Sequence, residues 1–119
     1  MFLHLNHTKD PIYFETRRFV NECYKLTKAF PLEEKYILTQ QIRRAAISVH
    51  LNLAEGASRN SGAERKRFYD ISRSSIVEID AALDIAEDFN YCNKEQLINV
   101  GRSMVECFKQ LSRIIKSLS

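Results

Sequence analysis

Apolar residues recur at intervals of three and four along most of the chain, and this spacing limits the possible folds more than any other feature. Such intervals place side chains on one face of an α-helix, whereas a half-buried strand requires strict alternation. Only three Gly and two Pro interrupt the pattern. The sequence therefore predicts an all-α protein, whose longest apolar series comprises Phe68, Ile71, Ser75, Ile79, Ala82, Ala86 and Phe89.

Residues that cap or end helices mark the first two predicted elements. Asp10 and Pro11 indicate an N-cap and first helical position, and this helix is expected to run to about Ala29. Thr39 is the expected cap of a second helix, which should end near Gly56 with that glycine in the left-handed conformation. The apolar faces of the two helices are Phe19, Cys23, Leu26, Phe30, Ile42, Ala46, Val49 and Leu53.

Two capping boxes open the remaining helices. Ser61 with Glu64, and Asn93 with Gln96, have the required spacing. Because the connections are short, neighbouring helices should be antiparallel, which predicts an up-down-up-down four-helix bundle. Residues 1–119 form one expected domain, with residues 1–10 as a frayed segment. The apolar face of the last helix is Leu97, Met104, Phe108, Leu111, Ile115 and Leu118.

The three cysteines indicate neither a disulfide framework nor a zinc site. They are odd in number, far apart and contain no C-x-x-C pair, so we expect free thiols that act as small apolar residues. A reducing cytoplasm fits this usage best. No apolar run approaches the length of a membrane span, and no leader is expected. The cysteines are Cys23, Cys92 and Cys107.

No pattern in the sequence indicates an enzyme. His4, His7 and His50 are expected on the surface, and no E-x-x-H pair occurs, which argues against a metal site within the bundle. The common phosphate-binding loops and the hydrolase nucleophile motif are absent as well. We therefore predict no catalytic residue, no metal and no cofactor.

Charge is unevenly distributed along the chain. Residues 40–75 sum to +4 and residues 76–92 to −5, within a total of only +3. The third helix is thus basic at its start and acidic at its end, the reverse of what the helix dipole favours. One explanation is assembly, because basic and acidic ends could meet head to tail in a ring of subunits.

The basic residues gather on either side of the expected loop between helices two and three. Cations grouped in this way attract a nucleic-acid backbone without selecting a sequence. A solvated helical face with local ion pairs is the competing interpretation. The candidate residues are Arg43, Arg44, Arg59, Arg65, Lys66, Arg67 and Arg73.

The segment 40–56, QQIRRAAISVHLNLAEG, resembles the signature QIRRAAxSIxxNIAEG of a family called four-helix bundle proteins or 23S rRNA intervening-sequence proteins. The resemblance extends from about Phe14 to the end of the chain. The family often has Pro-Ser where this chain has His50 and Leu51, so a straighter second helix is expected here. Arg44 and Glu55 of the signature lie too far apart to pair directly, and each is expected to meet another helix or subunit.

This resemblance implies a short bacterial, cytoplasmic protein, sometimes labelled as S23 ribosomal protein. The family is similar to the accessory protein of diversity-generating retroelements, a pentamer of four-helix subunits thought to bind nucleic acid and a reverse transcriptase. The resemblance therefore implies a homopentamer with a surface for RNA or DNA at the basic residues. It also implies a reverse transcriptase or another protein as a further partner. The leading hypothesis is a non-enzymatic oligomeric bundle that binds nucleic acid. The alternative is a scaffold that binds only protein.

Overall fold

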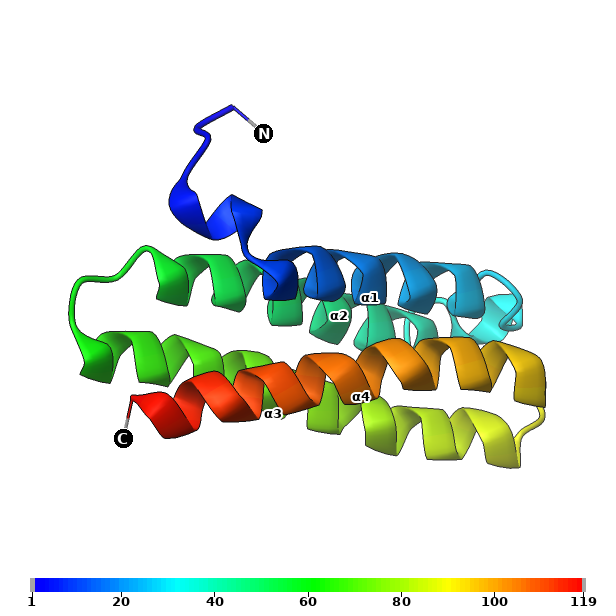
Figure 1. The fold of residues 1–119 in the computed structure, drawn as a ribbon. Coiled ribbons are helices and arrows are strands. Elements are labelled where there is room, and N and C mark those ends of the chain that lie inside the picture. Colours follow the sequence, from blue (N-terminus) through cyan, green and yellow to red (C-terminus); the bar gives the residue numbers. More distant parts are fainter. Residues whose placement is uncertain (1, 119) are drawn as a thin grey trace.

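The computed structural model describes residues 2–118. This range forms four α-helices and no strand (Figure 1), which confirms the prediction of an all-α four-helix bundle. Met1, within the segment expected to fray, and Ser119 lie outside the described residues. None of the helices between residues 2 and 118 has the length and apolar character needed to cross a membrane. The elements are η1 (Asn6–Lys9), α1 (Pro11–Thr27), η2 (Leu32–Glu34), α2 (Leu38–Ala57), α3 (Gly62–Asp88) and α4 (Lys94–Ser117).

Each α-helix packs against the next one in the sequence, and α4 also packs against α1, which closes the bundle. The colours in Figure 1 run in opposite directions along successive helices. The α2–α3 loop and the end of α4 therefore lie at the same end of the molecule (Figure 1). The α2–α3 contact is the most extensive and the α3–α4 contact is much smaller. This difference affects which residues of α3 and α4 are exposed.

Three of the four predicted helix caps form. The Asp10 side chain accepts a hydrogen bond from the amide of Ile12, at 3.2 Å, and Ser61 Oγ accepts one from the amide of Glu64, at 3.1 Å. At α4 both hydrogen bonds of the predicted capping box are present, whereas at α3 only the bond to Ser61 is, so the box predicted for Ser61 and Glu64 is half formed. The predicted cap at Thr39 is wrong. Helix α2 begins at Leu38, and Thr39 is buried within its first turn.

The core takes large side chains from all four helices. Phe19, Ile42, Ile79 and Leu111, one from each helix, are completely buried. Burial of one such side chain stabilises the fold by about 1.5–3 kcal/mol. Between α2 and α3 the core also contains a polar contact, in which buried Ser72 Oγ donates to the carbonyl of Val49 at 2.6 Å. This bond satisfies the hydroxyl and ties the two helices together.

The predicted apolar faces of α3 and α4 differ in part from the buried ones. Ile71 and Phe89 are 39% and 59% exposed, whereas Tyr69 and Ile76 are buried. In α4, Phe108 is 39% exposed. Because α3 packs closely on α2 and loosely on α4, its buried face is turned toward α2. Helical spacing identified the apolar residues but not the direction in which α3 packs.

Gly56 lies in the last turn of α2, and the prediction of a left-handed conformation there is wrong. The glycine is needed for space. A Cβ atom at this position would lie 2.8 Å from Cε1 of Tyr69 and 3.1 Å from Cβ of Phe68. Tyr69 is buried and cannot move aside easily. Gly56 thus lets α3 approach the end of α2 closely.

His50 is half-buried between α1 and α2, so its prediction as a surface residue is wrong. Its Nδ1 is 2.8 Å from Oγ1 of Thr16, and its ring centroid is 4.6 Å from that of Tyr13. Burial lowers the pKa of His50 below its ordinary value of 6.5, and the positive charges of Arg17 and His7 act in the same direction. The neutral imidazole is therefore the form that suits the folded protein.

This environment predicts a loss of stability on mild acidification. The unfolded chain binds the proton more readily than the folded protein, so His50 stabilises the fold fully above about pH 6.5 and less as the pH falls through its lowered pKa. We expect the free energy of unfolding, measured with urea between about pH 7 and pH 5, to decrease more for the unmodified protein than for His50→Gln. Equal decreases would show that other groups cause the effect.

Candidate nucleic-acid interface

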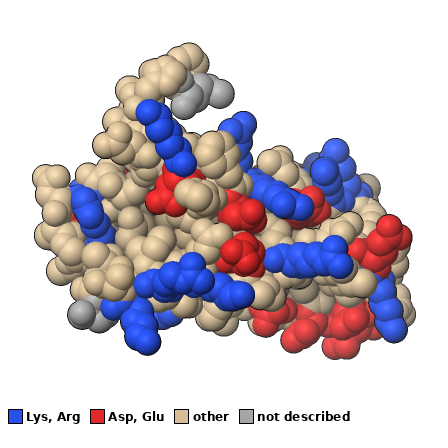
Figure 2. Space-filling model, viewed as in Figure 1, with Lys and Arg blue, Asp and Glu red and all other residues tan. Residues whose placement is uncertain are grey.

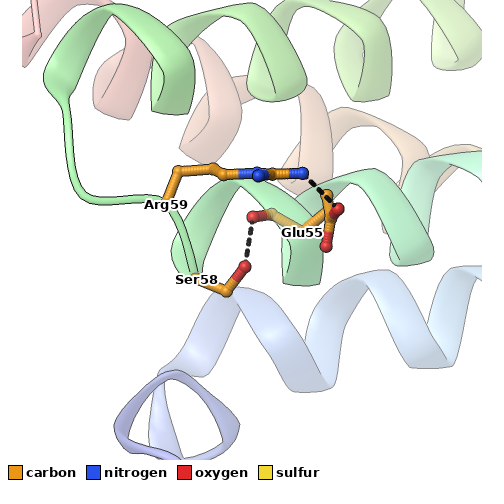
Figure 3. A network of polar contacts seen from close by, with 3 residues as sticks. All are labelled: Glu55, Ser58 and Arg59. Atoms are coloured by element: carbon orange, nitrogen blue, oxygen red, sulfur yellow. Dashed lines mark hydrogen bonds and ion pairs between the residues drawn. The ribbon is translucent and has the colours of Figure 1, made fainter.

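The α2–α3 loop holds Arg59 against the bundle. Nη2 of Arg59 binds Oε1 of Glu55 at 2.6 Å, and Ser58 Oγ donates to the Glu55 carbonyl at 2.7 Å (Figure 3). The Arg59 guanidinium also lies 4.9 Å from the ring centroid of Phe68. The prediction that Glu55 meets another helix or subunit is therefore wrong, because its partner is in the following loop. Arg59 is held in position and its charge is partly neutralised.

The first turns of α3 place three further cations beside this loop. Nε of Arg65 donates to the Arg59 carbonyl at 2.8 Å, which connects the helix to the loop. The Arg67 guanidinium lies 5.5 Å from the centroid of Phe68. Lys66 is 3.8 Å from Asp70 in an exposed ion pair, a kind that contributes about 0–1 kcal/mol. Most of this positive charge therefore faces solvent.

Arg73 links α3 to α4 nearly two turns further on. Its Nη1 donates to Ser112 Oγ at 3.2 Å, its Nη2 is 3.7 Å from Asp70, and its guanidinium is 5.8 Å from the centroid of Phe108. These contacts fix the register of α3 against α4. They also bring the last turns of α4 next to the first turns of α3.

Helix α4 supplies three exposed cations that the sequence interpretation missed, Lys109, Arg113 and Lys116. Within residues 2–118 none of the three makes an ion pair. We call the cations toward this end of the bundle the basic end, and Figure 2 shows blue side chains there as well as along the rest of the face in view. The basic end consists of Arg59, Arg65, Lys66, Arg67, Arg73, Lys109, Arg113 and Lys116.

Arg43 and Arg44 lie elsewhere. Arg43 is 14 residues before the end of α2, about 21 Å along the helix axis. Its Nε donates to Thr27 Oγ1 at 2.8 Å and its guanidinium is 4.7 Å from the centroid of Tyr24, so it connects α2 to α1. Arg44 is exposed on the same part of α2. The structure thus separates these two arginines from the other five candidate residues.

The second half of α3 is acidic on its exposed side. Figure 2 shows red side chains along the lower edge of the molecule, toward the end opposite the basic end. We call this group the acidic end. The uneven charge expected from the sequence is therefore present on the surface of the subunit. The acidic end consists of Glu78, Asp80, Asp84, Glu87 and Asp88.

Within residues 2–118, the buried cysteine thiols and the side chains that could bind a metal ion are not arranged for those roles. Burial raises the pKa of Cys23 and of Cys107 to about 12, so both thiols stay protonated near neutral pH. Both are buried in the core, as expected of small apolar residues. Residues 2–118 contain no group of three or more His, Cys, Asp or Glu side chains that could hold a metal ion.

Fold and surface together define a small four-helix bundle with a basic end and an acidic end. The chain belongs to the family of 23S rRNA-intervening sequence proteins, whose family model matches residues 9–113. This membership confirms the resemblance seen in the signature at residues 40–56. No curated protein matches the chain.

A solved structure has the same fold. It is a protein from Bacteroides thetaiotaomicron VPI-5482, described as a protein of unknown function from the S23 ribosomal protein family. The TM-score is 0.79 at 21% sequence identity, and the match covers 88% of this chain and 98% of that one. At this identity the likeness shows the fold alone.

Proposed function

We propose that this protein is a non-enzymatic, oligomeric helical bundle that binds RNA or DNA through the phosphates at its basic end. The observation that carries the proposal is that eight cations from the α2–α3 loop, α3 and α4 lie toward one end of the bundle. Separate segments of the chain contribute to one positive surface, as expected for contact with a flexible polyanion.

The arrangement of these cations favours phosphate contact over a purely structural role. Arg65, Arg67, Lys109, Arg113 and Lys116 are exposed, and within residues 2–118 none of them is paired with a carboxylate. Arg59 and Arg73, by contrast, are held by neighbouring residues and give the surface a defined shape. Phosphate contacts of this kind fix position and give affinity without base specificity.

The proposal includes a homo-oligomer, with a homopentamer as the state that the family resemblance implies. Opposite charges at the two ends of each subunit suit a head-to-tail contact that uses only part of the basic end and leaves the rest for phosphates. Several large apolar side chains are also exposed, and a subunit contact could cover them. They include Phe14, Leu51, Ile85 and Ile98.

The same apolar side chains favour the alternative function, a scaffold that binds only proteins, such as a reverse transcriptase. In that case the uneven charge would serve assembly, and the exposed arginines would contact protein. The two functions differ in salt dependence, because phosphate contacts release counterions and a mainly apolar contact does not.

The experiment that tests the proposal combines size exclusion with light scattering and fluorescence anisotropy. We expect an oligomeric mass, and binding of labelled RNA and DNA that weakens steeply when salt is raised from about 50 mM to about 200 mM. An oligomer that binds neither probe at the lower salt concentration would support the scaffold. A monomer would contradict the proposed assembly.

A further inference from the structure

A shallow groove lies between α3 and α4, beside the basic end. Its volume is about 270 Å³ and its walls are mainly apolar. Val77 and Val105 on these walls are 56% and 58% exposed, and Phe108, which also lines the groove, is 39% exposed. This volume is below that of most sites for drug-sized ligands, so the groove suits a flat ring.

The charged residues around the groove differ between its two ends. Lys109 lines the groove, and Arg73, one turn before Val77 on α3, lies close to the ring of Phe108. Arg113 follows Lys109 by one turn of α4. Asp80 lines the opposite end. A phosphate is therefore favoured at the end near Arg73 and repelled at the end near Asp80.

An aromatic ring between cations is the arrangement by which proteins hold single-stranded nucleic acid. Phosphates bind the cations, and an unpaired base stacks on the ring or fills the adjoining apolar space. In a duplex the bases are stacked on one another and cannot enter. The Phe68 ring, whose centroid is 4.9 Å from the Arg59 guanidinium and 5.5 Å from that of Arg67, repeats the combination of ring and cations on the same end of the bundle.

We infer that the α3–α4 groove binds an unpaired base of a single-stranded nucleic acid, with Phe108 as its stacking partner and Arg73, Lys109 and Arg113 as contacts for the adjacent phosphates. This inference rests on the proposed function and adds a preference for single strands. An amphipathic helix of another protein would also cover apolar side chains, but the cations at one end of this small groove favour the nucleic acid.

Anisotropy with three labelled probes tests the preference. The probes are a single-stranded oligonucleotide, its duplex, and an abasic strand with the same number of phosphates. We expect the single strand to bind about tenfold more tightly than the abasic strand, because stacking adds about 1–3 kcal/mol per base. Phe108→Leu should lose about fivefold to tenfold in affinity for the single strand and nothing for the abasic strand.

Phe89→Leu is the matched control, since Phe89 is also exposed but lies next to the acidic end. It should bind all three probes as the unmodified protein does. If unmodified protein binds the three probes equally and Phe108→Leu has no effect, the inference is wrong and the proposed function remains. If no probe binds, the proposed function fails. A lower oligomer mass for Phe108→Leu would identify the groove as a subunit contact and overturn the inference.

The chain contains no tryptophan, which allows a second measurement. Phe108→Trp and Phe89→Trp each introduce a single indole, whose fluorescence reports a stacked base directly. We expect the single-stranded oligonucleotide to quench the indole at position 108 and to leave the indole at position 89 unchanged. Absence of quenching at position 108 under conditions where the probe is bound would overturn the inference.

Discussion

Simultaneous replacement of Arg65, Lys66 and Arg67 by Ala is expected to weaken nucleic-acid binding about 100-fold at about 50 mM salt. Each phosphate contact to a single strand contributes about 0.7 to the slope of log affinity against log salt, so losing three contacts lowers the slope by about two. The variant should therefore differ most from the unmodified protein at low salt. Fluorescence anisotropy across a salt series measures both quantities.

A second triple variant controls for net charge. Replacing Lys25, Lys28 and Lys35 by Ala removes three exposed cations outside the basic end and lowers the formal charge by the same amount, from +3 to 0. It should keep nearly all of the affinity and salt dependence. If the two triple variants lose affinity equally, binding depends on overall charge, and the basic end is not a localised site.

Local signals in the sequence were sufficient for the elements of the fold. Asp10 and Asn93 accept hydrogen bonds from amides two and three residues away, so their roles could be recognised from spacing alone. The buried faces of α1 and α2 also follow directly from helical periodicity. These predictions needed no knowledge of how the helices pack.

The errors concern residues whose environment comes from a distant part of the chain. Gly56 was expected in the left-handed conformation, but it is helical and its role is set by Tyr69 of the next helix. The partner of His50 is Thr16, which is 34 residues away. Ile71 was expected on the buried face of α3 but is exposed. Periodicity alone does not indicate which neighbouring helix lies closest to that face.

The candidate interface was only partly predictable for the same reason. Five of the seven predicted cations lie at the basic end, because they are close in sequence to the α2–α3 loop. Arg43 binds Thr27 of α1 instead. The contribution of Lys109, Arg113 and Lys116 depends on the antiparallel packing of α4 against α3. The signal that could have identified them is the excess of positive charge in residues 93–119, combined with that topology.

Phe19→Ala is expected to have the largest effect on stability, lowering the free energy of unfolding by about 3–5 kcal/mol. Phe19 is completely buried at the centre of α1, and truncation of its ring would leave a cavity. The close packing of Cys23 and Leu26 on the same face limits how far the core can collapse into this space. Guanidinium unfolding followed by circular dichroism measures the change.

Phe14→Ala is the matched control, because Phe14 lies on the same helix and is 54% exposed. In an isolated subunit its removal should cost less than about 1 kcal/mol. The proposed oligomer adds a further test, since a residue buried between subunits contributes a stability that increases with protein concentration. A cost for Phe14→Ala that grows with concentration would place the exposed side of α1 in a subunit contact. A cost that equals that of Phe19→Ala at all concentrations would contradict the arrangement of the core.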